Sequence, residues 1–502
     1  KRSLMKPYWT AQGWNFARIL ADKMQGRSDH DHPEMWPGYN DACREREKIR
    51  PHIEHGYYPE RLFKERAPNQ TDAEAGYMRA NYRQVTLAHY DDYQNSILRA
   101  LHENNWSITY GKGEENEEEV TNDFKEYVTK GLNEFGSYLN YVRYIVPKVK
   151  TLDAMGLMVV LPKTIAVIID TDGNQTIDPE GEIDPVPQYI PVNDVWGFDY
   201  DRWYLWLTNE KSWVNRGQEK VKDGLVLMMV DDQNVYKITQ VGEKFKFLFQ
   251  IDIWWAHELG YAPAIHLRGN PKQKEGMMVW QSPYLTPSEP LDQVLLDYSY
   301  LGASKAKCVF PHPVMIGDDC EFVDNSTGAK CYAGDLSWTD TTSDPPLERH
   351  RQCPSCKGSG MKSRMGPLGT LLVRPPNRLD ERGESPTLAN ALSFVGPDVA
   401  TLDFLQTQVE ANTQAARTML HLSTEQPIVG GEQKTATQSG IDNKGHYAFI
   451  KPISDQVFDI YEFLLVTTGE MRYGPKFTGV SLTRPDSFDV RTEADMAIEI
   501  AD

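Results

Sequence analysis

The chain has 502 residues, which is more than one hydrophobic core usually serves, so we expect two to four domains. Its 40% hydrophobic and 25% charged residues are typical of an ordered protein, and no apolar run reaches the roughly 18 to 20 residues that span a bilayer. The net charge of −19 argues against a surface that holds nucleic acid through counterion release. If the protein handles DNA, the DNA should slide over it.

The first stretch, Lys1 to about Pro68, is rich in His, Pro, Trp and Arg, and one helix is predicted near Tyr39 to Ile49. Its histidines include His30, His32, His52 and His55. Clustered histidines can form a metal site, but irregular spacing beside proline favours solvated or packed side chains. We therefore expect no metal in this stretch.

Two long helices are predicted next. From Asp72 to Asn104 the apolar residues recur at helical spacing and form one broad stripe. The stripe consists of Met78, Tyr82, Val85, Tyr90, Tyr93, Ile97 and Leu101. A second helix should run from Glu117 to about Met155, and its opening acids lie where the helix dipole favours negative charge.

Residues from Gly156 to about His266 change to a period of two and a β-rich composition, which predicts short strands. The predicted strands are Leu157–Val160, Ile165–Ile169, Gln188–Ile190, Val195–Phe198, Leu225–Val230, Val235–Thr239, Phe245–Phe249 and Ile253–Trp255. The turn at Asp170–Asn174 resembles the start of a calcium loop. It lacks the glycine and the glutamate that such a loop needs further on, so a hairpin turn is favoured.

The next stretch places a small insertion between helices. A helix is predicted from about Ser288 to Val309, with Pro290 in its first turn. The strand-like Val314–Ile316 leads into the insertion, and Leu368–Val373 leads out of it. A further helix should run from Asp398 to about Leu422.

The last part of the chain begins with a polar, Gly-rich segment, Ser423 to Gly445, which we expect to be a loop. A helix from about Tyr447 to Met471 follows, and a helical pattern from Glu493 reaches the final residue, Asp502. The chain starts at Lys1 rather than Met, and it ends inside this helical pattern. We therefore expect residues to be missing at both ends.

Four of the six cysteines fall within the insertion. Cys320 and Cys331 are followed by the C-x-x-C pair of Cys353 and Cys356, and the small residues Gly358 and Gly360 come directly after it. Four thiolates, two of them from a C-x-x-C turn, form the ligand shell that Zn²⁺ prefers, and four protein ligands leave no position for catalytic water. We predict a structural zinc ribbon in a reducing cytoplasm; two disulfides or four unconnected thiols are the alternatives. The remaining Cys43 and Cys308 should be buried or inert.

Catalytic motifs are absent from the sequence. It contains no G-x-x-x-x-G-K-[ST] loop, no G-x-G-x-x-G after a strand, no G-x-S-x-G and no H-E-x-x-H. We therefore expect a protein that is not an enzyme.

The order of these segments is similar to that of portal proteins of tailed bacteriophages: wing, stem helix, clip, stem helix, tunnel loop, long helix and crown. Three stretches strengthen the likeness, namely Tyr93–Leu101, Leu291–Asp297 and Lys434–Gln438 before the long helix. The zinc insertion followed by Gly366-Pro-Leu-Gly369 is similar to portals of phages that infect Bacteroidetes-type hosts, although most portals lack a zinc insertion. The likeness covers about residues 70 to 502 and lies more in the order of elements than in motifs.

The resemblance implies an α+β fold with portal architecture. The implied divisions are 1–287 for the N-terminal region and wing, 288–310 for the first stem helix, 311–397 for the clip with its zinc ribbon, 398–422 for the second stem helix, 423–445 for the tunnel loop, 446–492 for the long helix and wing return, and 493–502 for the start of a largely missing crown.

The resemblance also implies a function. The chain would form a homo-oligomeric ring of about twelve subunits, a dodecamer, at one vertex of the virion capsid. The ring would assemble in the host cytoplasm. Its partners would be double-stranded DNA in the channel, terminase, the head-to-tail adaptor and the major capsid protein, with no membrane. The residues that would meet DNA are Lys305, Lys307, Arg417, Lys434, Thr435 and Thr437.

Two other classes of protein share part of the pattern. The run from Cys353 to Gly360 is one complete C-x-x-C-x-G-x-G unit, as in J-domain co-chaperones, but those carry the unit several times and this chain lacks their His-Pro-Asp signature. A zinc-ribbon nucleic-acid binder would need a basic face near the ribbon. Candidates for such a face are Lys330, Arg349, Arg351, Lys357, Lys362 and Arg364.

Overall fold

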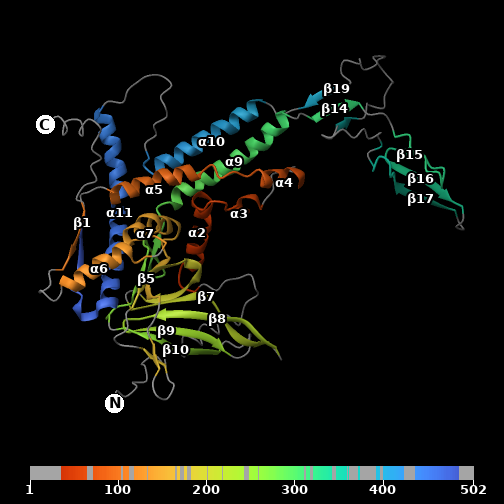
Figure 1. Ribbon diagram of the computed structural model, residues 1–502. Coiled ribbons are helices and arrows are strands. Elements are labelled where there is room, and N and C mark those ends of the chain that lie inside the picture. The colour runs from red at the N-terminus through yellow and green to blue at the C-terminus, as the bar shows by residue number, and fades with distance from the viewer. Residues whose placement is uncertain are drawn as a thin grey trace. The chain divides into compact units, whose positions relative to one another are not determined.

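The computed structural model has a mixed α+β fold with several small, mostly antiparallel sheets, which confirms the α+β class of the predicted fold (Figure 1). It describes residues 35–64, 72–102, 106–111, 118–132, 134–163, 167–169, 175–177, 183–199, 202–216, 219–241, 248–257, 259–309, 312–316, 320–341, 346–358, 360, 371–373, 392–395, 399–422 and 436–484.

The chain divides into two compact units. Unit 1 comprises residues 1–59, 84–292 and 413–502, and unit 2 comprises residues 60–83 and 293–412. The boundaries fall inside α9 (Leu285–Val309) and α10 (Val399–Met419), so each of these helices contributes residues to both units.

The core of unit 1 forms around α11 (Ala436–Tyr473), the long blue helix of Figure 1. Ile450, Ile453, Val457, Tyr461 and Leu464 recur at helical spacing along it, and all are buried. Burying one such side chain contributes roughly 1.5 to 3 kcal/mol, so this stripe is a main source of the stability of the unit.

Shorter helices of unit 1 contribute to the same core. They are α2 (Tyr39–Ile53), α5 (Leu87–His102), α6 (Glu118–Lys130), α7 (Tyr138–Tyr144) and α8 (Val146–Leu152). The helix predicted near Tyr39 is thus confirmed and extends four residues beyond Ile49. Its His52 is buried and lies 2.9 Å from the hydroxyl of Thr86, as expected of a packed histidine. His30 and His32 lie outside the described residues.

The largest sheet has the order β10-β9-β8-β7-β6. Its strands are β6 (Val195–Asp199), β7 (Trp203–Arg216), β8 (Glu219–Val230), β9 (Asn234–Val241) and β10 (Leu248–Ala256). Successive side chains of β7 point to opposite faces of the sheet. Tyr204 and Trp206 therefore pack in the core of unit 1, whereas Leu205 packs in a second apolar cluster with Leu227. Both faces of the sheet are therefore used for packing.

The smaller sheets of unit 1 complete its β structure. One has the order β11-β2-β5, formed by β11 (Ala264–His266), β2 (Leu157–Pro162) and β5 (Pro185–Ile190). Antiparallel pairs form between β1 (Ser107–Tyr110) and β20 (Val480–Thr483), between β12 (Asn270–Lys274) and β13 (Met277–Gln281), and between β3 (Val167–Ile169) and β4 (Gln175–Ile177). The last pair confirms the hairpin predicted there, although its turn lies outside the described residues.

Unit 2 contains α3 (Glu60–Phe63), α4 (Asp72–Ala80), most of α9 and the first part of α10. Between α9 and α10 the chain forms a sheet of order β18-β14-β19, made of β14 (His312–Ile316), β18 (Leu371–Val373) and β19 (Leu392–Val395). β14 pairs with β18 in parallel and with β19 in antiparallel orientation. The segment that contains the four cysteines is inserted between the two parallel strands.

Both predicted long helices between residues 72 and 155 are interrupted. The first ends at Ala80 because the backbone and side-chain amides of Asn81 both donate to the carbonyl of Tyr77, and a new helix, α5, begins at Leu87. The second splits into α6, α7 and α8. Ser137 caps α7 by accepting from the amide of Asn140, and Pro147 opens α8.

The two long C-terminal helices begin earlier than expected. α9 starts at Leu285, so Pro290 lies inside the helix rather than in its first turn. α11 starts at Ala436 rather than Tyr447, so the second half of the predicted loop 423–445 is helical. Residues 423–435 and the helical pattern from Glu493 lie outside the described residues.

Strand prediction was wrong in two ways. The end of the predicted strand Phe245–Phe249 and all of Ile253–Trp255 belong to one strand, β10, which begins at Leu248 and carries a register shift between Ile253 and Trp255; residues 245–247 lie outside the described residues. The fourteen-residue strand β7 was not predicted, because its residues 208–212 are all polar; in the structure Ser212 and Val214 are buried, whereas Trp213 between them is 55% exposed. β1, β4, β11, β12, β13 and β20 were also missed.

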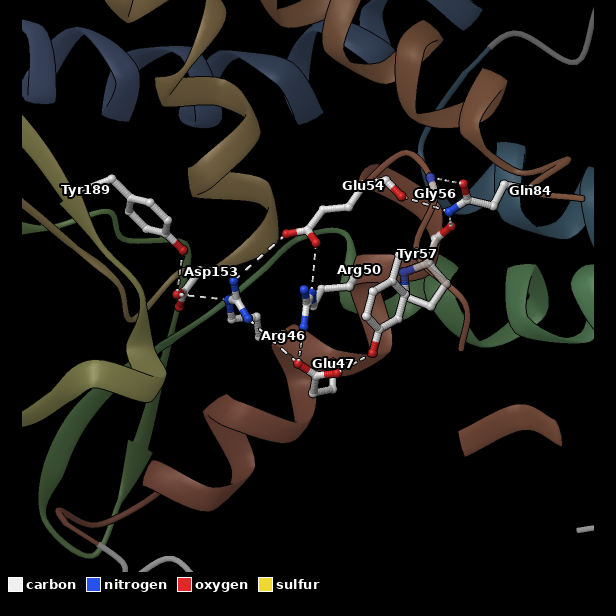
Figure 2. Close-up of polar contacts among 10 residues, drawn as sticks. Arg46, Glu47, Arg50, Glu54, Gly56, Tyr57, Gln84, Asp153 and Tyr189 are labelled. Carbon is white, nitrogen blue, oxygen red and sulfur yellow. Dashed lines mark hydrogen bonds and ion pairs between the residues drawn. The ribbon is translucent and has the colours of Figure 1, made fainter. Parts of the chain in front are cut away.

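A network of ionised groups joins α2 to the loops around β2 and β5 (Figure 2). Asp153 is buried, and its carboxylate accepts from the Tyr189 hydroxyl at 2.9 Å and from the Val192 amide at 2.6 Å. The Arg46 guanidinium lies 3.7 Å from the same oxygen. Burial raises the pKa of Asp153 to about 6 while Val192 and Arg46 lower it, so the group stays ionised at neutral pH.

Arg50 extends this network toward the end of α2. It bonds the carboxylates of Glu47 and Glu54, each at 2.9 Å, and its guanidinium lies over the ring of Tyr57. Gln84 donates to the carbonyl of Glu54 at 2.8 Å. Polar contacts thus help to fix the C-terminal end of α2, in addition to the buried side chains of Ile49 and Ile53.

We expect His266 to make unit 1 sensitive to acid. Burial lowers its pKa to about 4, whereas histidine in an unfolded chain titrates near 6.5. Between these values only the unfolded chain binds the proton, so the stability contributed by neutral His266 is present above pH 6.5 and is lost as the pH falls, by about 3 kcal/mol. Compared with His266→Gln, the parent should therefore lose unfolding free energy between pH 6.5 and 4 in urea titrations. His55 is exposed, so His55→Gln serves as the control. Parallel curves of unfolding free energy against pH for the parent and His266→Gln would contradict the prediction.

Within the described ranges, no helix is both long enough and apolar enough to cross a membrane.

Candidate metal centre

The first two cysteines are brought together by a small hairpin. Val323 pairs with Lys330 in an antiparallel bridge, and the turn between them is closed by the amide of Gly328 donating to the carbonyl of Asp324 at 2.7 Å. The amide of Cys331 donates to the carbonyl of Phe322 at 2.9 Å. This pairing places Cys331 close to Cys320.

The other two cysteines follow the last strand of a three-stranded sheet. The sheet has the order β15-β16-β17, formed by β15 (Cys331–Tyr332), β16 (Asp335–Asp340) and β17 (Leu347–Gln352). Cys353 comes directly after β17, and its carbonyl accepts from the amide of Lys357 at 2.9 Å, which closes the C-x-x-C turn. The amide of Cys320 donates to the carbonyl of Gly360 at 2.9 Å and ties the two halves together.

The four sulfurs converge on one point. All four Sγ atoms lie within 4.8 Å of one another, with 3.9 Å between Cys320 and Cys353 and 3.6 Å between Cys331 and Cys356. Tetrahedral zinc with Zn–S bonds of about 2.3 Å places its sulfurs about 3.8 Å apart. The predicted cluster of Cys320, Cys331, Cys353 and Cys356 is confirmed, and its geometry and donor set fit a metal such as zinc.

The alternative of two disulfides does not fit this geometry. A disulfide requires about 2.05 Å between sulfurs, and all four cysteines of the cluster are free. Cys320, Cys353 and Cys356 are buried together with Leu336, which is fully buried. In a region this small, the sulfurs themselves make up most of the core.

Two glycines permit the close backbone packing around the sulfurs. Gly334 has φ 103°, and a Cβ there would lie 2.2 Å from the carbonyl oxygen of Gly358. Gly358 has φ 84°, and a Cβ there would lie 2.4 Å from Nε2 of Gln352. Any other residue at position 334 would separate the C-x-x-C turn from the turn after β15.

The thiols of the cluster differ in their pKa values. Desolvation, followed by hydrogen bonding to Cys356, raises the pKa of Cys331 to about 12. For Cys356 desolvation acts in the same direction, but the Gly360 amide and the neighbouring thiols lower the pKa to about 7. One proton of these interacting thiols therefore leaves more easily than that of a free thiol, and a metal cation would favour loss of the others.

Two of the four described basic side chains near the ribbon are paired with acids. Arg351 lies 2.5 Å from the carboxylate of Asp324, and Arg349 lies 3.5 Å from that of Asp340. Arg351 also lies over the ring of Trp338. This pairing reduces the positive face that a nucleic-acid-binding ribbon would need; Lys362 and Arg364 lie outside the described residues.

The six residues predicted to meet DNA are only partly described. Lys305 is exposed on α9, and Arg417 on α10 pairs with Asp92 at 2.9 Å. Lys307 and Thr437 lie in α9 and α11, but their side chains are not described, and Lys434 and Thr435 lie outside the described residues. The role of these six residues therefore stays a prediction.

The sequence predicted the character of the two lone cysteines but not the network of ionised groups around Asp153. Cys43 is half-buried, and burial raises the pKa of its thiol to about 11, which fits an inert cysteine. Cys308 lies in α9 with an undescribed side chain. The pairing of Arg46 with Asp153 was not predicted, because no local pattern links residues so far apart in the chain.

No protein-family model and no curated protein sequence matches this chain.

Proposed function

We propose that this chain is the subunit of a portal, a ring at one capsid vertex through which double-stranded DNA passes. The observation that carries the proposal is the order of elements in the second half of the chain. α9 is followed by the sheet β18-β14-β19 with the inserted cysteine cluster, then by α10 and the long α11. This order corresponds to stem, clip, stem and long helix in the family that the sequence resembles.

The surface of α10 supports assembly into a ring. Among the residues of this 21-residue helix only Ala416 is buried. Val399 is 67% exposed and Phe404 is 61% exposed. A helix that exposes large apolar side chains gains stability when a neighbouring copy covers them, and a closed ring covers them in every copy.

The proposal gives the cysteine cluster a structural role. We propose that one Zn²⁺ binds Cys320, Cys331, Cys353 and Cys356 and folds the end of the clip, which has little core of its own. The folded clip would present the docking surface for terminase and the head-to-tail adaptor. No catalytic reaction is assigned to the chain.

The proposal predicts that the purified full chain forms a ring. Mass photometry should show a species of about twelve times the 57.3 kDa of one chain, and negative-stain images should show a central channel. Phe404→Asp should shift the mass toward smaller species, because it places a charge in the proposed contact, whereas Gln406→Asp on the exposed face of the same helix should not. A chain that stays monomeric or dimeric at every salt concentration would contradict the proposal.

A further inference from the structure

Unit 2 contains a cavity between the C-terminal end of α4 and the middle of α9. Its volume is about 390 Å³, and α9 contributes two turns of its wall, from Tyr298 to Ala306. The rest of the wall comes from Tyr77, Met78 and the segment that follows α4. This volume lies within the range of roughly 300 to 1,000 Å³ that is usual for small-molecule sites.

The charge of the cavity is opposite to that of the chain. Arg83 and Lys305 line it, and no Asp or Glu does, although the whole chain has a net charge of −19. Both side chains are exposed, and within the described part of the chain neither forms an ion pair. An anion in the cavity would therefore meet two cations that have no competing carboxylate in the wall.

The remaining wall combines aromatic, polar and small residues. Tyr77 and Tyr298 line it, together with Asn81 and Ser299. On α9, Gly302 leaves room: a Cβ placed there would meet no atom within 4 Å. An inorganic anion would use the cations and leave the rings without a partner. A purely apolar ligand would leave the cations without one.

We propose that this cavity binds a nucleotide unit, with its phosphate held by Arg83 and Lys305 and its base against Tyr77 and Tyr298. Cations hold phosphate through charge-assisted hydrogen bonds, and aromatic side chains hold bases of any identity by stacking. The proposal rests on the cavity alone and does not depend on a portal function. The nucleotide unit can come from a free nucleotide or from an unpaired position in a nucleic acid.

Binding by the full-length chain tests the chemistry of the ligand. Isothermal titration with ATP should show saturable binding, whereas adenosine and pyrophosphate, each of which offers half of the contacts, should bind at least about tenfold more weakly. Lys305→Ala should weaken ATP binding by about tenfold and reduce its dependence on salt, since one charge-assisted contact is lost. If adenosine binds as tightly as ATP, the phosphate contacts are refuted.

Gly302→Leu tests where the ligand lies, because Gly302 lines the cavity and a Cβ added to it would meet no atom within 4 Å. It should abolish ATP binding and leave the far-ultraviolet circular dichroism unchanged. Gly76→Leu is the matched control: Gly76 is also an exposed helical glycine in unit 2, a Cβ added to it would meet no atom within 4 Å, and it does not line the cavity. Equal ATP binding by the Gly302→Leu variant and the parent would overturn the proposal.

A third titration separates the two sources of the nucleotide unit. A twelve-nucleotide single-stranded DNA that competes with ATP and loses its binding in Gly302→Leu would assign the cavity to nucleic acid. ATP binding without such competition would assign it to a free nucleotide. A change in oligomer mass in Gly302→Leu, with no binding of ATP or DNA to the parent, would show that a second copy of the chain fills the cavity and would refute the proposal.

Discussion

Cys356→Ser is expected to remove zinc from the protein and to unfold the cysteine-rich region from residue 320 to residue 360. The four sulfurs form most of the core there, so little else holds the three strands together once a ligand is lost. Structural zinc sites contribute roughly 10 to 16 kcal/mol of apparent binding free energy in small domains, far more than the few apolar contacts of this sheet. Elemental analysis should give one zinc per parent chain and close to none in the variant.

Hydrogen exchange should show that the loss is local. Amides of β16 and β17 should exchange rapidly in Cys356→Ser, whereas those of the buried strand β2 should stay protected. Cys43→Ser is the control, because Cys43 lies outside the cluster and should keep the metal content of the parent. A parent chain purified without chelator that carries no zinc, or a Cys356→Ser chain that retains it, would contradict a zinc site.

Asp153→Ala is expected to lower the unfolding free energy by about 3 to 5 kcal/mol. The substitution leaves the Val192 amide and the Tyr189 hydroxyl without their acceptor and removes the nearest buried carboxylate from Arg46. Asp199→Ala should change the unfolding free energy by less than about 0.5 kcal/mol, since the ion pair of Asp199 with Arg202 is exposed. Urea unfolding of the two variants measures the difference.

A second variant distinguishes the charge from the packing. Arg46→Met combined with Asp153→Leu leaves the Val192 amide and the Tyr189 hydroxyl without an acceptor, as Asp153→Ala does, but it also removes the Arg46 guanidinium. It should therefore cost less than Asp153→Ala to the extent that an uncompensated Arg46 charge destabilises Asp153→Ala. If Asp153→Ala costs less than about 1 kcal/mol, then water or a shift of the backbone satisfies these groups and the network does not fix α2.

The parts of the fold that could be predicted from the sequence are those that a local pattern encodes. α10 has regular apolar spacing, and its predicted bounds differ from the observed ones by one to three residues. The cysteines were found because their chemistry restricts what four thiols so close in sequence can do. The helix predicted from Glu117 is split because Ser137 caps α7 and Pro147 opens α8. The spacing of apolar residues alone does not indicate either boundary.

Features that depend on distant partners could not be predicted. Asp153 looks like an ordinary loop acid until Tyr189, Val192 and Arg46 are placed around it. The cavity requires α4 and α9 to lie together although more than two hundred residues separate them in the chain. In β7, the run of residues 208–212 is entirely polar, so the apolar alternation by which strands are recognised is absent from the sequence there, although Ser212 and Val214 are buried in the structure.

The parallel pairing of β14 with β18 gives the metal an influence beyond its ligands. Parallel neighbours need a crossover connection, and here the crossover is the whole cysteine-containing segment. Closing a flexible loop costs about 0.6 kcal/mol more for each doubling of its length. A cross-link between Cys320 and Cys356 shortens the effective connection by more than half, so zinc should favour the pairing of these two strands by about 1 kcal/mol through chain entropy alone, without contacting either of them.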